Sequence, residues 1–351
     1  MKRTNLPPSK KLSEQMGRRT HMYKIYEGDP TIMITTGSTL LDLAISGGRV
    51  RGGGIPSGIL VEIFGPSQTG KTVLLCEIAG AVQRQGGEVL FSDPEARLNK
   101  QFAKMFGLNT NKMGYTTPDT IPEVFEGVRN WTPDNPKVIN GIIADSLAAL
   151  STNMEMDKNE GDKMGMRRAK EFSEELRKTC RILAKNKYLM VCSNQIRQNM
   201  NAGEFGPRFR SPGGEAIPFY ASLRLRTSLS KKGKIKQIIK VAGKEIPRII
   251  GVNIEVEVFK SSVWNPYRVA PLTILFDYGI DNIRQNLQFI KTYEKNSIYY
   301  AGKNKLAQGM EESIQMVEED ELETILQEQT IDLWEDIESR FRSDRKPKSR
   351  D

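Results

Sequence analysis

Short apolar runs alternate along the chain with longer segments in which apolar residues recur at helical spacing. Four runs have the length of buried strands: residues 59–64, 89–91, 141–144 and 188–192. The segment after the first run, residues 72–83, places its apolar residues on one helical face. Strands that alternate with helices are typical of βαβ units. The pattern therefore predicts an α/β fold with a mostly parallel central sheet.

Later segments predict half-exposed strands and then a helical region. Residues 249–259 alternate apolar and polar side chains, and residues 272–276 form another short apolar run. After Asp277 the pattern becomes helical and polar, and residues 311–328 carry eight acidic side chains and no basic one. Apolar residues are interleaved with these acids. This spacing predicts an amphipathic helix that packs on a small C-terminal domain.

These changes in the pattern of apolar and polar residues divide the chain into four parts. Residues 1–30 are rich in basic side chains, contain three prolines and show little periodicity, which indicates an exposed N-terminal arm. Residues 31–280 carry the α/β pattern and are the predicted core. We expect a small C-terminal α+β domain at residues 281–341 and a basic tail at residues 342–351.

Charge and composition narrow the classes of function. Lys and Arg number 52 against 43 Asp and Glu, a formal net charge of +9, which favours polyanionic partners such as nucleic acid. The three cysteines are scattered and His21 is the one histidine, so we expect no zinc site and no histidine-based triad. The sequence contains no run of 18 apolar residues. We therefore expect no membrane segment and a place in the reducing cytoplasm.

A glycine-rich loop follows the first predicted strand. The sequence GPSQTGKT matches the pattern GxxxxGK[ST] between a strand and a helix, where backbone N–H groups point at phosphate oxygens. Lys71 is expected to reach the β- and γ-phosphates. The residues predicted to hold the nucleotide are Gly65, Pro66, Ser67, Gln68, Thr69, Gly70, Lys71, Thr72 and Val73.

A magnesium ion is expected beside this loop. Thr72 carries its hydroxyl at the position that ligates Mg²⁺ in loops of this kind. Asp145 follows directly after the run 141–144, so its carboxylate lies at the end of a neighbouring strand. The sequence thus predicts ATP and Mg²⁺ as the ligands of the core.

Two further strand ends carry groups suited to hydrolysis. Glu95 lies just beyond the run 89–91, where α/β sheets place their chemistry, and a carboxylate there can deprotonate an attacking water. Gln195 follows the run 188–192 and can hydrogen-bond a water or a γ-phosphate. These positions predict an ATPase rather than a simple nucleotide-binding protein.

In order and spacing, these motifs resemble those of the RecA family of recombinases. They are GPSQTGKT, FSDPE, IIADSLAAL, NQIR and PFYASLRLR, with TTGSTLLD, MGMRRAKEF and residues 278–310 also similar. The resemblance covers roughly residues 31–341. The short arm and the extreme C-terminus, which is not acidic, indicate a divergent member of the phage-encoded UvsX type.

The resemblance implies an ATP-dependent recombinase that forms a helical filament on single-stranded DNA and exchanges strands with double-stranded DNA. It implies that Glu95 is the catalytic base, that Lys71 binds the phosphates and that Gln195 links the nucleotide to DNA. Asn99, Phe102 and Tyr278 match positions that bind the nucleotide, although Asn99 and Phe102 replace the family's usual Asp and Tyr. Single-strand-binding proteins or mediators are further partners that the family suggests.

Across the subunit interface, the family directs two lysines at the nucleotide of the neighbouring protomer. Here Lys260 matches the first lysine, and Ser262 stands at the place of the second. Losing a cation there removes stabilisation of transition-state charge. We therefore expect weaker hydrolysis, or a substitute cation such as Arg268.

Two loops of the family line the filament axis and bind DNA, and they match residues 153–165 and 196–212. The second combines basic, aromatic and glycine residues, which suits phosphate contacts and a wedge between bases. The predicted DNA-binding residues are Arg167, Arg168, Lys170, Arg197, Phe205, Arg208, Arg210, Gly213 and Gly214. A second basic cluster, residues 224–248, is either a hairpin or loop that touches polyanion or a solvated charge run.

Three alternatives stay open at this point. One is a RecA-like ATPase, mediator or ring, that binds DNA without strand exchange. Another is a metabolic phosphotransferase, against which the arginine-rich loop and the basic balance count. The last is a DNA-coating scaffold without turnover, against which the presence of both Glu95 and Lys71 counts.

Overall fold

The computed structural model describes residues 32–152, 164–198, 209–210, 215–341 and 345. By its contacts the chain divides between Thr31 and Ile32, and the fold below is that of the part that begins at Ile32. The predicted arm, most of both predicted DNA loops and nearly all of the basic tail lie outside the described residues. The predicted boundary near residue 281 stays a prediction.

A nine-stranded sheet forms the centre of the described residues, in the order β11-β10-β9-β8-β1-β5-β4-β2-β3. Its strands are β1 Leu60–Gly65, β2 Val89–Ser92, β3 Met113–Thr116, β4 Gly141–Ala144, β5 Leu189–Gln195, β8 Leu223–Val241, β9 Lys244–Ser261, β10 Val269–Leu275 and β11 Gly279–Ile280. The strands from β8 to β3 in this order pair in parallel, and β8 to β11 pair antiparallel. The predicted α/β fold with a mostly parallel sheet is therefore confirmed.

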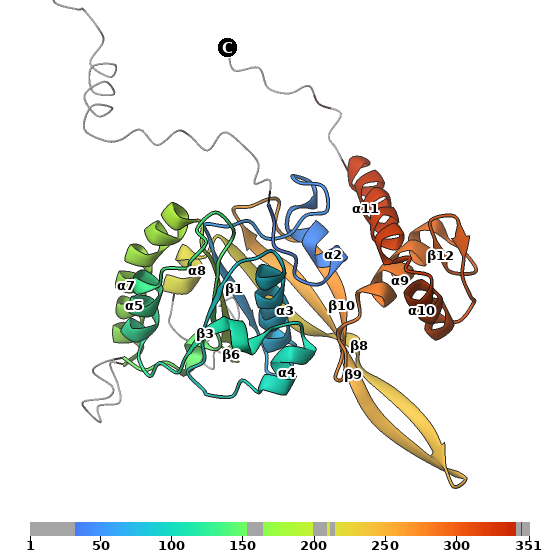
Figure 1. The fold of residues 1–351 in the computed structure, drawn as a ribbon, viewed down its shortest axis with the longest axis horizontal. Helices are drawn as coiled ribbons and strands as arrows, with labels where there is room; N and C mark the ends of the chain where they lie inside the picture. Colours follow the sequence, from blue (N-terminus) through green and yellow to red (C-terminus); the bar gives the residue numbers. More distant parts are fainter. Residues whose placement is uncertain (1–31, 153–163, 199–208, 211–214, 342–344, 346–351) are drawn as a thin grey trace, which may run out of the picture. The chain divides into compact units, whose positions relative to one another are not determined.

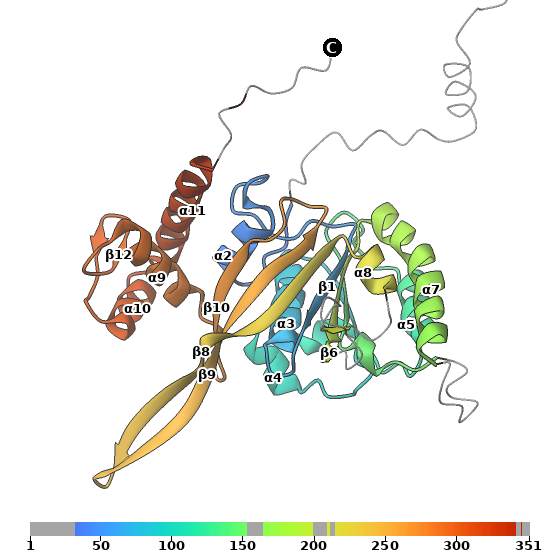
Figure 2. The ribbon, with the colours of Figure 1, turned by 180° about the vertical axis from the view of Figure 1, so that it is seen from behind.

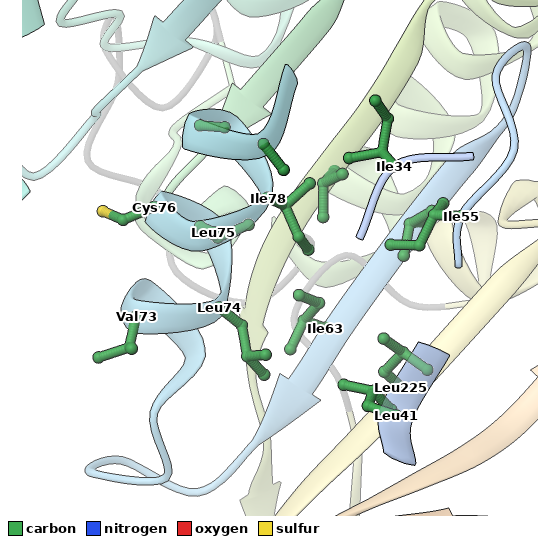
Figure 3. Close-up of a cluster of buried hydrophobic side chains, with 14 of the residues drawn as sticks. Ile34, Leu41, Ile55, Ile63, Val73, Leu74, Leu75, Cys76, Ile78 and Leu225 are labelled. Atoms are coloured by element: carbon green, nitrogen blue, oxygen red, sulfur yellow. The ribbon is translucent and has the colours of Figure 1, made fainter. Parts of the chain in front are cut away.

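Helices cover both faces of this sheet (Figure 1). In the core they are α2 Thr39–Asp42, α3 Lys71–Arg84, α4 Lys100–Met105, α5 Ile121–Asn130, α7 Met164–Asn186 and α8 Ala216–Tyr220. Alternate residues of β1 point to opposite faces, since Val61 and Ile63 belong to one apolar cluster and Leu60 to another. The first cluster packs α3 on the sheet, with Leu74 and Ile78 beside Ile63 (Figure 3). The second packs α5, α7 and α8.

Short elements complete the core. A π-helical turn, η1 Leu43–Gly47, follows α2, and the 3₁₀ turns are η2 Thr110–Lys112 and η3 Leu147–Ala149. The two-residue strands β6 Arg197–Gln198 and β7 Phe209–Arg210 pair antiparallel outside the large sheet. Sequence patterning missed β3, because its residues are mostly exposed and give no apolar run.

The hairpin of β8 and β9 is much longer than the strand predicted at residues 249–259. Only residues 223–226 of β8 pair with β1, and residues 251–257 of β9 pair with β10. Beyond them, in the described residues, the two strands pair with each other up to Val241 and Lys244 (Figures 1 and 2). The basic cluster 224–248 is therefore a hairpin. Lysines in this cluster interrupt the alternation of apolar and polar residues, so the sequence pattern did not predict the full length of the strands.

The C-terminal part contains α9 Asn282–Glu294, β12 Tyr300–Ala301, β13 Asn304–Lys305, α10 Met310–Glu319 and α11 Glu323–Ser339. Leu287, Ile290 and Val317 contribute to its own apolar cluster. The single helix predicted over residues 311–328 is wrong, because the chain turns between α10 and α11. Glu321 adopts a positive φ of 53° there, which an α-helix cannot continue through.

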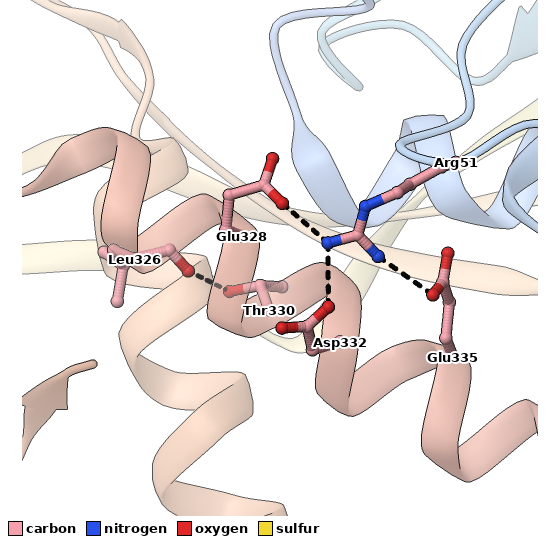
Figure 4. Close-up of polar contacts among 6 residues, drawn as sticks. All are labelled: Arg51, Leu326, Glu328, Thr330, Asp332 and Glu335. Carbon is pink, nitrogen blue, oxygen red and sulfur yellow. Dashed lines mark hydrogen bonds and ion pairs between the residues drawn. The ribbon is translucent and has the colours of Figure 1, made fainter. Parts of the chain in front are cut away.

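Arg51 joins this C-terminal part to the core (Figure 4). Its guanidinium contacts three carboxylates on one face of α11: Glu328 at 2.6 Å, Asp332 at 2.7 Å and Glu335 at 2.9 Å. These acids raise the pKa of Arg51. Of these three acids, only Glu328 belongs to the acidic stretch 311–328, and Asp332 and Glu335 follow it on α11.

Glu77 of α3 makes the stability of the core depend on pH. Burial raises the pKa of its carboxyl from 4.5 to about 7, against the opposing effects of the Ile280 N–H and Arg84. The folded chain binds this proton more tightly than the unfolded chain. The contribution to stability is therefore fully present below pH 4.5 and is lost as the pH rises to about 7.

Glu77→Gln is expected to remove this loss, because the amide stays neutral and still accepts a hydrogen bond. The variant should match the wild type near pH 4.5 and unfold with about 2 kcal/mol more free energy at pH 7.5. Urea unfolding across this range measures the difference. Glu319→Gln, at an exposed position of α10, is the control. Parallel pH profiles of Glu77→Gln and the wild type would contradict the assignment.

Candidate nucleotide-binding site

The glycine-rich loop connects β1 to α3 and borders a cleft of about 1060 Å³. Gly70 begins the helix with a φ of 74°, which favours glycine. A Cβ at Gly70 would also lie 2.4 Å from Cδ1 of Ile274, so the loop packs closely on β10. The N-terminus of the 14-residue α3 therefore presents its backbone N–H groups to the cleft, as anion binding requires.

Lys71 lies over this loop and lines the cleft. Its Nζ donates to the carbonyl oxygens of Gly65 at 3.1 Å and Pro66 at 2.6 Å. Burial lowers the pKa of Lys71, while the carboxylates of Asp145 and Glu95 act to raise it. An incoming phosphate would add the anionic partner that a partly desolvated ammonium favours.

Thr72 and Asp145 meet as the sequence predicted. The Thr72 hydroxyl donates to Oδ2 of Asp145 at 2.7 Å, and the Ser193 hydroxyl donates to the other carboxylate oxygen. The described residues contain no group of three or more side chains that could enclose a metal by themselves. One hydroxyl and one carboxylate suit Mg²⁺, which takes its other ligands from phosphates and water. The residues present therefore fit a magnesium–nucleotide complex.

Glu95 and Gln195 border the same cleft as Lys71. Glu95 follows β2, and its carboxylate forms an ion pair of 2.8 Å with Arg97. Gln195 ends β5, directly beside Gly65 in the register of the sheet. The structure thus brings the predicted base and the predicted phosphate sensor to the phosphate-binding loop. Arg97 is a neighbour that the sequence did not single out.

The far end of the cleft is aromatic. Phe102 packs edge-to-face on Phe106 with ring centroids 4.3 Å apart, and both border the cleft. Asn99 caps α4, since its side-chain oxygen accepts from the backbone N–H of Gln101 at 2.8 Å. Asn99 also borders the cleft. Its position is therefore compatible with a nucleotide contact as well as with capping α4.

Tyr278 does not border this cleft, and Phe276 does. Phe276 and Ile274 share a face, since they are two residues apart at the end of β10, and the Phe276 N–H donates to Ile250. The chain then turns, with the Tyr278 N–H near the carbonyl of Leu275, and Tyr278 stays half exposed. The structure therefore places Phe276, and not Tyr278, at the cleft, and a nucleotide contact by either residue stays a prediction. The signal that identifies Phe276 is its distance of two residues from Ile274, because residues two apart along a strand point to the same face.

The β8–β9 hairpin also contributes to the wall of the cleft, through Leu229, Lys234, Ile249 and Val252. Sequence reasoning noted Lys234 only as part of a basic cluster. Periodicity gave no signal here, because the register of the hairpin shifts between Leu229 and Lys234.

Lys260 lies apart from the groups around Lys71 and does not border the cleft. Its Nζ donates to the carbonyl oxygens of Pro218 at 2.8 Å and Phe219 at 3.0 Å. Burial and the nearby charge of Arg224 lower the pKa of Lys260. A role toward a neighbouring protomer stays a prediction.

Arg268, expected as a substitute cation, is already engaged within the chain. Its guanidinium forms an ion pair with Glu338 of α11 and lies 5.6 Å from the ring centroid of Trp334. Ser262 contributes its backbone N–H to Ser222 at 2.7 Å. In this structure Arg268 therefore ties β10 to the C-terminal helix.

A buried ion pair supports the strand that ends in Gln195. Glu62 of β1 accepts from Nε of Arg224 at 2.6 Å and from Nδ2 of Asn194 at 2.9 Å. The Glu62 side chain is fully buried, and that of Arg224 is 11% exposed. Arg224 also stacks over Phe64, 4.4 Å from its ring centroid. β1, β5 and β8 are thus joined just behind the phosphate-binding loop.

The predicted DNA-binding residues are only partly described. Arg197 and Arg210 pair in register between β6 and β7, so the strands that flank the second loop meet directly beyond Gln195. On α7, Arg167 is exposed, and Lys170 is 79% exposed with a loose contact of 3.9 Å to Glu174.

Arg168 instead donates to the carbonyls of Leu147 and Ala148 at 3.2 and 2.7 Å, which braces the turn after β4. Phe205, Arg208, Gly213 and Gly214 lie outside the described residues. A DNA role for each of these residues stays a prediction.

Comparison with known proteins decides the family. A sequence model of the RecA N-terminal domain matches residues 10–281. The chain belongs to the RecA family. It is 33% identical over 302 residues to Protein RecA of Borrelia hermsii strain HS1, covering 84% of this chain and 80% of that protein.

The chain is similar to further proteins. Protein RecA of Borreliella afzelii is 32% identical over 88% of this chain and 79% of its own length, and that of Delftia acidovorans is 31% identical over 88% and 81%. A crystal structure of the RadB recombinase aligns with 18% identity and a TM-score of 0.49, over 71% of this chain and 98% of its own. In the part of the chain that is described, no helix is both long and apolar enough to span a membrane.

Proposed function

We propose that this RecA-family chain is an ATP- and Mg²⁺-dependent recombinase that polymerises on single-stranded DNA and exchanges strands with homologous double-stranded DNA. The observation that carries the proposal is a single cleft that holds Lys71, Glu95 and Gln195 and borders Asp145. A phosphate-binding loop, a base and a phosphate sensor together suit turnover better than passive nucleotide binding.

Each group has a separate task in hydrolysis. The loop amides and Lys71 bind the phosphates, and a magnesium ion held by Thr72 and Asp145 would neutralise the charge that develops on them. Glu95 orients the attacking water and accepts its proton. Thr72 and Asp145 supply the protein oxygens for the ion, and the hydrogen bond from Ser193 fixes the direction of the Asp145 carboxylate. Phe102 and Phe276 offer aromatic surfaces for the base.

Coupling to DNA follows from the position of Gln195. Its strand continues directly into β6, whose partner β7 lies at the far side of the second predicted DNA loop. A γ-phosphate that engages Gln195 therefore biases the strands that flank this loop, and hydrolysis removes the bias. The backbones of Arg197 and Arg210 pair in register within this predicted loop, and arginine is a residue type that suits phosphate contacts.

The partners follow from this function. Single-stranded and double-stranded DNA are the substrates, further copies of the chain form the filament by a heterologous contact, and single-strand-binding proteins or mediators assist loading. Binding is expected to fall steeply with salt and to be independent of sequence. The cytoplasm, where DNA and ATP are both present, is the proposed place of action.

A strand-exchange assay tests the proposal. With ATP and Mg²⁺, the protein should transfer a labelled strand from a homologous duplex to single-stranded DNA, and a duplex of unrelated sequence is the matched control. The exchanged product should form only when ATP is present, whether the ATP is hydrolysed or only bound. DNA-stimulated hydrolysis without any exchange, on closed rings seen by electron microscopy, would instead support a mediator or a ring ATPase.

A further inference from the structure

The β8 strand bulges where it passes the phosphate-binding loop. Leu229 pairs with Ile254 and Lys234 pairs with Val252, so residues 230–233 lie opposite Asn253 alone. Such bulges redirect side chains and are frequent beside active sites. Here the bulge determines which face of the hairpin Lys234 occupies.

That face is the wall of the cleft. Val252 pairs with Lys234 on one side and with Ile274 on the other, so the three side chains stand next to one another across β8, β9 and β10. Ile274 packs against Gly70 of the phosphate-binding loop, and all three residues border the cleft together with the loop. Lys234 therefore stands in the same row as the residue that supports the loop.

Of the three cations that border the cleft, Lys71, Arg97 and Lys234, only Lys234 has neither a hydrogen bond nor an ion pair within the described residues. Lys71 donates to two carbonyls of its own loop, and Arg97 forms an ion pair with Glu95. Arg268 is engaged with Glu338. The exposed ammonium of Lys234 carries a free positive charge into a cleft that also contains the carboxylates of Glu95 and Asp145.

We propose that Lys234 binds the polyphosphate of the nucleotide held by its own chain, as a cation supplied in cis by the β8 bulge. Lys234 and the loop border the same cleft. A lysine side chain is long and flexible, and its ammonium is a point charge that suits a phosphate. This role rests on the proposed ATP binding and adds a residue to it.

Nucleotide titrations without DNA test the role. ATP, ADP and AMP, each with Mg²⁺, are titrated into wild type, Lys234→Gln, Lys234→Arg and the matched control Lys236→Gln by isothermal calorimetry. Lys236 is also exposed, lies two residues further along the same strand and does not border the cleft. Lys234→Gln should weaken ATP binding about tenfold, as loss of one charge-assisted contact does, and AMP binding less. Lys234→Arg should restore most of the affinity.

The outcomes separate the two proposals. If the wild type binds no ATP, the proposed function and this role both fail. If the wild type binds ATP and Lys234→Gln binds equally well, only the role of Lys234 fails. Equal losses in Lys234→Gln and Lys236→Gln would show general electrostatics and overturn the specific contact. A variant with normal nucleotide affinity and weakened DNA binding would assign Lys234 to DNA instead.

Discussion

Glu95→Gln is expected to lower the turnover number for ATP hydrolysis about a thousandfold, within the range that a positioned general base contributes. The amide keeps the size and most hydrogen bonds of the side chain but cannot accept the proton of the attacking water. Glu95 borders the cleft beside Lys71, while the loop amides and Lys71 that bind the phosphates are untouched. ATP affinity should therefore stay within about threefold of the wild type.

Steady-state hydrolysis and an ATP titration, made on the same preparations, measure both quantities. Glu319→Gln makes the same chemical change at an exposed position of α10 outside the cleft and should leave both unchanged. Turnover close to wild type in Glu95→Gln would place the base elsewhere. Loss of ATP affinity with unchanged turnover would make Glu95 a binding residue and contradict the assignment.

Glu62→Met is expected to cost about 3–5 kcal/mol of unfolding free energy, because it leaves the charge of a partner buried and unpaired. Arg224 has a side chain that is 11% exposed and donates to Glu62 at 2.6 Å. Asn194 also loses its acceptor. The substitution removes contacts that join β1, β5 and β8. β1 leads into the phosphate-binding loop, and β5 ends at Gln195. Urea unfolding measures the loss.

The double variant Glu62→Met with Arg224→Met separates the pair from the packing around it. Two apolar side chains leave no unpaired charge, so the double variant should be more stable than Glu62→Met alone. Arg224→Met is measured as the second single variant. If the losses of Glu62→Met and Arg224→Met simply add in the double variant, the ion pair contributes nothing and the account of this region is wrong. The stacking of Arg224 over Phe64 would then be the dominant contribution.

The sequence predicted which residues meet around the glycine-rich loop, because these signals are local. In GPSQTGKT the glycines, Lys71 and Thr72 are all within eight residues of the end of one strand, and the motif fixes their geometry. Asp145 and Glu95 were found because each follows a short apolar run, and parallel strands bring their carboxyl ends to one edge. The run 141–144 coincides with β4.

The residues at the aromatic part of the cleft and in the β8–β9 hairpin could not be predicted in the same way. Tyr278 was named and Phe276 was not considered, because the turn after Leu275, which removes Tyr278 from the face of Ile274, leaves no mark in the apolar pattern. Lys234 borders the cleft because of a register shift between two paired strands, and register is a property of the pair. Neither position can be derived from one strand alone.

The break between α10 and α11 was missed for a different reason. The acids and the interleaved apolar residues continue through Glu321 without glycine or proline, so the sequence reads as one helix. Tertiary packing decides the break, since Val317 and Leu326 on either side of it both enter the same apolar cluster. Two helices bury both residues beside α9.

The rate of ATP hydrolysis in Mg²⁺, with and without single-stranded DNA, tests the central claim most directly, with the same samples viewed by electron microscopy. The cleft and the strands beyond Gln195 predict hydrolysis that DNA stimulates strongly, on helical filaments, and that Glu95→Gln abolishes. Hydrolysis at one rate with and without DNA, by a monomer or a closed ring, would contradict the claim.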